Sequence, residues 1–287
     1  MSAREITSPG RRFRQLLQKR NIILPGAFNA LSALLIERSG FEAVYLSGAG
    51  LANGVAGLPD IGLLTLTEVI TQVQHITQAV KIPAIADADT GFGEGLHLLR
   101  ALSVFESADV AGIQIEDQQF PKRCGHLSGK SLINEEDMVR KIQILVKERQ
   151  DPDFLIIART DARGVTGLDD AIQRACAYRH AGADIIFPEA LKSAEEFSIF
   201  ARSVKGLLLA NMTEFGQSPA LPAEALFALG YRIVLFPMTL FRLAAKSMET
   251  GLAVLKQNGT SKNMLDKMQK RDDLYHLLHY DVFEKED

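Results

Sequence analysis

The chain has 287 residues, of which 47% are hydrophobic and 23% are charged, and its net charge is −3. A charged fraction near the globular average of about 25% excludes a disordered chain, and the lack of a basic excess argues against nucleic-acid binding. No apolar run approaches the roughly 18 residues of a transmembrane helix, so no membrane association is expected. The 2 cysteines are too few for a disulfide framework and are expected to be free thiols.

The segment before Ile22 is rich in Arg and Lys but contains no apolar stretch of a secretory signal. A mitochondrial presequence would also be Arg-rich. Glu5 and the core-like sequence that starts at Ile22 favour a solvated first helix instead. Together with the free thiols, this predicts a cytoplasmic protein, with the mitochondrial matrix as the alternative.

Short apolar runs rich in β-branched residues recur along the chain and predict buried strands. They lie at 22–24, 43–46, 84–86, 112–115, 154–158, 184–187, 207–210 and 232–236. Segments with helical periodicity follow these runs in alternation, at 28–38, 68–80, 95–107, 135–148, 168–180, 194–202, 222–229 and 240–255. Alternating strands and helices indicate parallel strands joined by crossover helices.

Eight such units predict an α/β protein with a (β/α)8 TIM-type barrel as a single domain over residues 1–287, preceded by an extra N-terminal helix. A doubly wound open sheet is the alternative. No Gly-x-Gly-x-x-Gly motif follows the first strand, which disfavours a dinucleotide-binding fold. Residues 239–287 are predicted to form a C-terminal helical arm, whose apolar stripe packs on its own barrel in the simplest interpretation.

Polar side chains follow most of the predicted strands at their carboxyl ends, where a barrel carries its chemistry. A single Asp there is usually a helix cap or a loop residue. Several successive strand ends converge on one axis, however, so the pattern predicts an active site. Its members are Ser47, Asp87, Asp89, Glu116, Asp117, Arg159, Asp161, Glu189, Asn211, Thr213 and Arg242.

The Asp87-Ala88-Asp89 motif predicts a magnesium site. Residues at i and i+2 of an extended backbone point to the same side, and Mg²⁺ typically takes one or two carboxylates and keeps several waters. Glu116 and Asp60 could hold those waters. Alternatively, the two Asp residues only end a strand. No pair of histidines has the spacing of a zinc site.

Arg159 and Arg242 are expected to bring fixed positive charge to the same end of the barrel. Guanidinium groups bind carboxylates through two parallel hydrogen bonds. The sequence therefore predicts a small substrate with several carboxylates, bound in a pocket that is locally positive although the protein is acidic overall.

The loop Lys122-Arg123-Cys124-Gly125-His126 follows the fourth predicted strand. Its basic neighbours are expected to lower the pKa of Cys124 from about 8.5, and its glycines to let the loop close as a lid. Cys124 could be a nucleophile or a proton donor. Carboxylate chemistry favours the proton donor, because no recognisable set of cysteine-protease residues accompanies it. Cys176 lies in a helical segment and is expected to be an inert core thiol.

This loop resembles the signature of the isocitrate lyase and phosphoenolpyruvate mutase superfamily, in its lyase branch. Further matching segments lie at 45–48, 58–60, 87–93, 115–118, 158–162, 187–190, 211–215 and 268–271. The resemblance implies Mg²⁺-dependent cleavage of a tricarboxylate, 2-methylisocitrate, to pyruvate and succinate in the methylcitrate cycle of propionate catabolism. Isocitrate and 2,3-dimethylmalate are the alternative substrates. Isocitrate lyases are considerably longer than this chain, which favours the methyl-substituted substrate.

The resemblance also implies an assembly and individual residue roles. The assembly is a homotetramer, a dimer of dimers, in which the eighth barrel helix is exchanged between subunits. Asp87 and Asp89 match the Mg²⁺ ligands, with Asp60 and Glu116 beside them. The catalytic set is Cys124, Lys122, His126 and Tyr45, the last as the candidate base. The substrate-binding set is Ser47, Gly48, Ala49, Cys124, Gly125, Arg159, Glu189, Asn211, Met212, Thr213, Arg242 and Arg271; Ala49 replaces a glycine common in the family.

Overall fold

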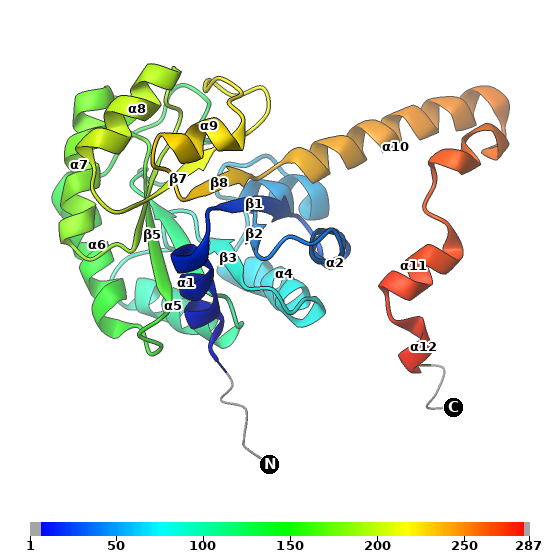
Figure 1. The fold of residues 1–287 in the computed structure, drawn as a ribbon, viewed down its shortest axis with the longest axis horizontal. Helices are drawn as coiled ribbons and strands as arrows, with labels where there is room; N and C mark the ends of the chain where they lie inside the picture. Colours follow the sequence, from blue (N-terminus) through cyan, green and yellow to red (C-terminus); the bar gives the residue numbers. More distant parts are fainter. Residues whose placement is uncertain (1–6, 284–287) are drawn as a thin grey trace, which may run out of the picture.

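The structure is a computed structural model that describes residues 7–283. Its centre is a closed barrel of eight parallel strands in sequential order, so the predicted barrel is confirmed and the open sheet is excluded (Figure 1). Pairing of β8 with β1, from Ile22–Ile233 to Pro25–Phe236, closes the barrel. The strands are β1 Ile22–Ala27, β2 Val44–Leu46, β3 Ala84–Asp87, β4 Gly112–Glu116, β5 Leu155–Thr160, β6 Ile185–Pro188, β7 Leu207–Asn211 and β8 Ile233–Phe236.

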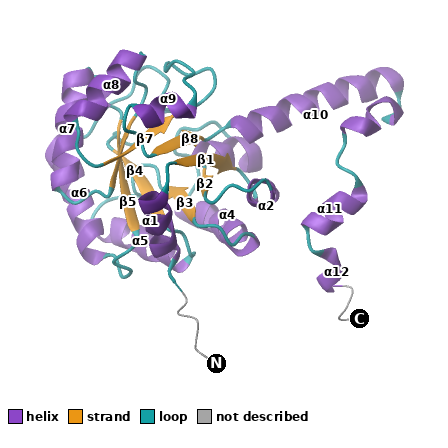
Figure 2. Cartoon of the chain, viewed as in Figure 1, coloured by secondary structure: helices purple, strands orange, loops and turns teal. Residues whose placement is uncertain are grey.

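Helices form an outer ring around these strands (Figure 2). Local signals in the sequence set many of their ends. Thr65 and Glu68 form a capping box at the start of α4, and Gly182 adopts a φ of 106° just after α7. The α-helices are α1 Pro9–Lys19, α2 Ala30–Arg38, α3 Gly48–Leu51, α4 Leu66–Ala79, α5 Leu96–Ser107, α6 Glu135–Glu148, α7 Leu168–His180, α8 Ala194–Ser203, α9 Ala223–Ala228, α10 Thr239–Asn258, α11 Arg271–Leu277 and α12 Tyr280–Phe283.

The apolar core has two layers. One lies between the strands and the helix ring, and the other contains alternate strand residues such as Leu24, Ile85 and Leu209. The first helix, α1, joins the second layer, because Phe13 is 0% exposed and Leu17 is buried with it. The expectation of a solvated first helix was therefore wrong for one face. The apolar side chains of α1 bury that face against the barrel.

The C-terminal arm leaves the barrel. Helix α10 projects from it as a long rod (Figure 1), and none of its residues is buried. Where α10 departs, an apolar groove of about 230 Å³ remains open, lined by Ile23, Pro25, Leu35, Ile36, Phe41, Phe236 and Leu240 among others. The chain then turns back, and the Arg38 guanidinium in α2 donates to the Asp273 carbonyl at 3.4 Å. Among the described residues, no helix has the length and apolarity to cross a membrane.

Candidate active site

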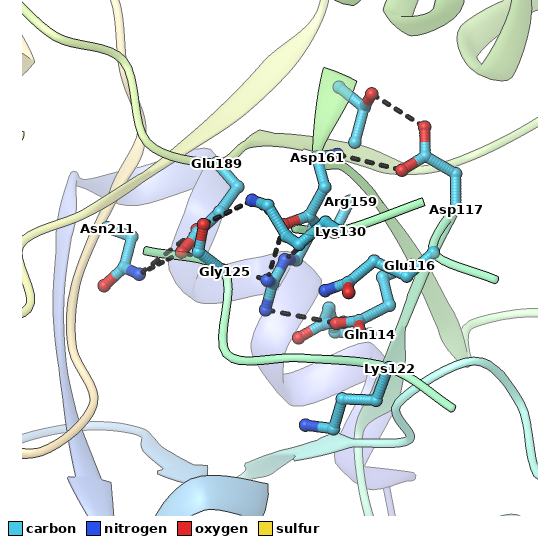
Figure 3. Close-up of polar contacts among 12 residues, drawn as sticks. Gln114, Glu116, Asp117, Lys122, Gly125, Lys130, Arg159, Asp161, Glu189 and Asn211 are labelled. Atoms are coloured by element: carbon cyan, nitrogen blue, oxygen red, sulfur yellow. Dashed lines mark hydrogen bonds and ion pairs between the residues drawn. The ribbon is translucent and has the colours of Figure 1, made fainter. Parts of the chain in front are cut away.

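The carboxyl ends of the strands bring most of the predicted polar residues together, as the sequence indicated (Figure 3). The Arg159 guanidinium lies at the centre of this cluster and is held by carboxylates from three strand ends. Its Nε and Nη2 donate to Asp161 at 2.9 and 3.0 Å, and its Nη1 lies 3.1 Å from Glu116 Oε2. Burial lowers the pKa of Arg159, but the charges of Asp161, Glu116 and Glu189 outweigh it and raise that pKa. Arg159 is therefore a permanent cation.

Asp87 and Asp89 converge, but not through an extended backbone. Strand β3 ends at Asp87, and Asp89 has a φ of 48°, so the expected strand geometry was wrong. The turn lets the Asp89 amide donate to Asp87 Oδ1 at 3.2 Å. The Gly48 amide donates to Asp87 Oδ2, also at 3.2 Å. The Lys122 ammonium lies 2.7 Å from Asp89 Oδ1 and also contacts Asp60.

The cluster contains more carboxylates than cations, so its side chains alone do not make the expected locally positive pocket. Burial and the charge of Asp89 raise the pKa of Asp87 to about 6, and burial raises the pKa of Glu116 despite the Arg159 charge. The carboxylates are Asp60, Asp87, Asp89, Glu116, Asp161 and Glu189, and the cations are Lys122, Lys130 and Arg159. Such an excess of buried negative charge calls for a further cation.

The donor set fits a hard divalent cation. Glu116 Oε1 is buried, and no described residue donates a hydrogen bond to it. Within residues 7–283, no three His, Cys, Asp or Glu side chains form a closed metal cluster. An ion held by Asp87 and Asp89 would complete its shell with water and substrate oxygens, which is the usual arrangement for Mg²⁺.

Tyr45 is poorly suited to the role of base that the sequence suggested. Its buried hydroxyl donates to Gln114 Oε1 at 2.7 Å. Burial, followed by the charge of Asp87, raises the pKa of Tyr45 well above its ordinary value. The side chain is therefore a phenol that donates a hydrogen bond, and it does not ionise readily.

The loop thiol also differs from its expected state. Burial raises the pKa of Cys124, although a hydrogen bond from the His126 backbone opposes this. The expected lowering was wrong because burial outweighs the nearby positive charge, and Lys122 is paired with Asp60 and Asp89. Cys124 therefore keeps its proton, as a proton donor must.

His126 is held between two loops. The backbone amide of Gln217 donates to His126 Nδ1 at 2.9 Å, so the proton of the neutral ring lies on Nε2. That nitrogen is 3.0 Å from Glu189 Oε1, and Asn211 Nδ2 donates to Glu189 Oε2 at 3.2 Å. Burial raises the pKa of Glu189, but Arg159 and His126 outweigh it and lower that pKa. Glu189 is therefore an ionised anchor for the loop.

Two of the predicted arginines lie outside this cluster. The Arg242 side chain is 42% exposed and lies 3.7 Å from Glu214, with its guanidinium over Phe215. Arg271 begins α11 in the arm. Neither contacts the residues around Arg159 in any interaction found among the described residues.

The remaining predicted residues line the turns around the cluster. Ser47 Oγ accepts from the Gly50 amide at 3.1 Å and caps α3, the helix that holds Gly48 and Ala49. Met212 is buried beyond the end of β7, and Thr213 follows it. Three further residues at the site were not predicted from the sequence, namely Gln114, Lys130 and Gln217. Only Lys130 offered a signal, as a basic residue immediately after the glycine-containing loop.

Several known proteins resemble this chain over nearly its whole length. Residues 13–255 match the family model described as phosphoenolpyruvate phosphomutase. A 2-methylisocitrate lyase of Aeropyrum pernix is 52% identical over 280 residues, which cover 97% of this chain and 90% of that protein. The crystal structure of a 2,3-dimethylmalate lyase gives a TM-score of 0.92 at 34% identity, covering 98% of this chain and 95% of that one. A phosphonopyruvate hydrolase in complex with oxalate and Mg²⁺ gives 0.88 at 27% identity, covering 97% of each chain.

Proposed function

This chain belongs to the phosphoenolpyruvate phosphomutase family, and we propose that it is a carbon–carbon lyase that cleaves 2-methylisocitrate to pyruvate and succinate. This reaction is a step of the methylcitrate cycle of propionate catabolism. The 52% identity to a 2-methylisocitrate lyase supports this substrate. The observation that carries the chemistry is the convergence of Asp87, Asp89, Arg159 and the Cys124 loop at one end of the barrel.

The proposed reaction moves one proton off the substrate and another onto it. The hydroxyl on the carbon that bears the methyl group loses its proton to a buried carboxylate of the cluster, for which Glu116 is the candidate because burial raises its pKa. The hydroxyl oxygen becomes the carbonyl oxygen of pyruvate. The electrons of the adjacent carbon–carbon bond pass to the carbon that becomes part of succinate. Positive charge stabilises the carboxylate next to that carbon as its negative charge grows. Arg159 is the buried guanidinium available for this task.

Asp87 and Asp89 would hold Mg²⁺, with Glu116 and Asp60 behind them. A divalent cation supplies charge that polarises the hydroxyl and carboxylate of the substrate. The phosphonopyruvate hydrolase complex with Mg²⁺ supports such an ion in this family. Lys122 holds Asp60 and Asp89 in place through its ammonium group.

Cys124 would donate the proton that completes succinate. Its thiol keeps its proton because burial raises its pKa, and Gly125 brings the loop against Arg159 and Glu189. A Cβ atom at Gly125 would overlap Arg159 Nη2 and Glu189 Oε1. His126 orients the loop through Glu189 and Gln217. The residues of the surrounding turns are proposed to contact the substrate, namely Ser47, Gly48, Ala49, Asn211, Met212 and Thr213. Arg242 and Arg271 lie outside the cluster, and their proposed contact with the substrate requires them to move toward it.

A substrate panel tests this assignment. We expect kcat/KM for 2-methylisocitrate to exceed that for isocitrate by at least about tenfold, because one methyl-sized difference is worth about 10- to 200-fold. 2,3-Dimethylmalate has a methyl group where 2-methylisocitrate has a carboxymethyl group, so loss of the charged hydrogen bonds to that carboxylate should lower its kcat/KM by at least about tenfold as well. The measurement is formation of the 2-oxo acid product from each compound. Faster turnover of 2,3-dimethylmalate than of 2-methylisocitrate would support the proposed lyase reaction and overturn the proposed substrate. The resemblance to 2,3-dimethylmalate lyase makes that compound the second candidate.

We also propose that a second copy of the chain covers the apolar groove beside β1 with its own α10. Ile23 in β1 is 39% exposed, unusual for a barrel strand that a helix should cover. Met248, Leu252 and Leu255 form one exposed apolar face of α10. Exchange of α10 between neighbours would bury both surfaces, as in a tetramer built from two dimers.

Sedimentation equilibrium tests this assembly. We expect a tetramer at micromolar concentration, and we expect Leu252→Glu to dissociate it because a charge would then lie in an apolar contact. The matched control, Thr250→Glu, lies on the opposite face of α10 and should remain tetrameric. A monomeric wild-type protein would contradict the proposed exchange.

We propose that the enzyme works in the cytoplasm, with the mitochondrial matrix as the second candidate. Both cysteines are free, and the proton donor must remain a thiol. A reducing compartment keeps thiols reduced.

A further inference from the structure

One set of contacts fixes the base of the catalytic loop, and a different contact holds its tip at Cys124 and Gly125. An isolated antiparallel bridge joins Gln118 to Leu132. The Gln118 amide also holds Arg123, since it accepts from the Arg123 backbone N–H at 2.9 Å and donates to the carbonyl at 2.8 Å. These contacts define where the loop starts and ends. None of these contacts involves Cys124 or Gly125.

Lys130 supplies a contact between the loop tip and the barrel (Figure 3). Its side chain is 1% exposed, and its ammonium lies 2.7 Å from Asp161 Oδ1. The same ammonium donates to the Gly125 carbonyl in the loop tip. Asp161, which is fully buried, also receives both hydrogen bonds from Arg159. One carboxylate therefore positions both the loop and the buried guanidinium.

Charge neutralisation alone does not account for Lys130. Arg159 already pairs with Asp161 in a bidentate manner, at 2.9 and 3.0 Å, so that carboxylate has a cationic partner without Lys130. Lys130 also donates a hydrogen bond to the Gly125 backbone carbonyl in the loop. Gly125 lies so close to Arg159 and Glu189 that a side chain has no room there, so displacement of the tip would break this close packing. An ammonium tether is a direct way to prevent that displacement.

We propose that Lys130 is a positioning residue that holds the catalytic loop closed, by tethering the Gly125 carbonyl to the carboxylate that orients Arg159. It acts on the reaction through Cys124, whose sulfur must lie within reach of the substrate carbon. This inference rests on the proposed lyase function. Gln217 and the buried Glu189 also hold the loop, both through His126, and Lys130 is the attachment that acts on the Gly125 backbone.

The test is Lys130→Met, which keeps the length of the side chain and removes its donors. We expect kcat for 2-methylisocitrate to fall about 100-fold, as for a misplaced catalytic group, while KM changes much less. We also expect iodoacetamide to alkylate Cys124 at least about tenfold faster in the variant without substrate, as followed by mass spectrometry of the Cys124 peptide. Asp161→Asn should instead change both kcat and KM, because it also releases Arg159.

Lys141→Met is the matched control, since Lys141 is also a buried lysine but contacts Thr90 and Glu94. It should keep the wild-type alkylation rate at Cys124. A folded Lys130→Met protein with a wild-type alkylation rate and a wild-type kcat would overturn the inference. A Lys130→Met variant whose only change is a lower Tm would also overturn the inference. If the proposed function were wrong, the wild type would turn over no substrate, yet the difference in alkylation rates would persist.

Discussion

Replacing Cys124 by Ser should lower kcat for 2-methylisocitrate by about 100- to 10,000-fold, the range contributed by a positioned acid. The exchange is nearly isosteric, but an alcohol holds its proton far more tightly than a thiol and cannot donate it efficiently to carbon. Because the loop backbone contacts are unchanged, the substrate should still bind. Stopped-flow or steady-state measurement of kcat, with calorimetry of binding to the variant, gives both quantities.

The matched control is Cys176→Ser, since Cys176 packs against the helix layer outside the cluster. It should keep wild-type kcat. A Cys124→Ser enzyme with wild-type kcat would show that another group donates the proton. The pH profile provides a second check. Burial raises the pKa of Cys124, so the thiol stays protonated through neutral pH, and kcat/KM should decline only above the ordinary thiol value of about 8.5.

Removing divalent cations should abolish turnover, and Mg²⁺ should restore it. The cluster contains more carboxylates than cations, and Asp87 in particular has its pKa raised to about 6 by burial and by Asp89. Without a divalent ion, this negative charge would repel a tricarboxylate instead of binding it. We expect Asp87→Asn to lower kcat/KM by more than about 1,000-fold, since it removes one of two carboxylate ligands and charge stabilisation by a metal is worth several kcal/mol. The substitution should also weaken Mg²⁺ binding measured by calorimetry.

The control for this substitution is Asp169→Asn, an exposed carboxylate in the first turn of α7, which should change neither Mg²⁺ binding nor turnover. Full activity in excess chelator would contradict the proposed role of Mg²⁺. Weak Mg²⁺ binding with unaltered turnover in Asp87→Asn would show that the ion has no role in the reaction.

The order and type of the secondary-structure elements could be predicted from the sequence. Runs such as 112–115 and 232–236 are short, apolar and β-branched, and a buried parallel strand requires this pattern. The polar residues beyond β3 to β7 were also predictable as a group, because parallel strands in a barrel all end on one face. This explains why Asp87, Glu116, Arg159 and Glu189 meet although they are far apart in sequence.

The protonation states and the contacts of those residues were decided by the tertiary structure. The neighbours of Cys124 in sequence predicted a lowered pKa, but burial raises it and Lys122 pairs elsewhere. Tyr45 became a hydrogen-bond donor to Gln114, and Lys130 reached both Gly125 and Asp161. The sequence by itself determined the barrel and the end at which its chemistry lies, because periodic patterns and strand order are local properties. Charge, proton affinity and loop position depend on burial and on distances between remote residues, which only the folded barrel sets.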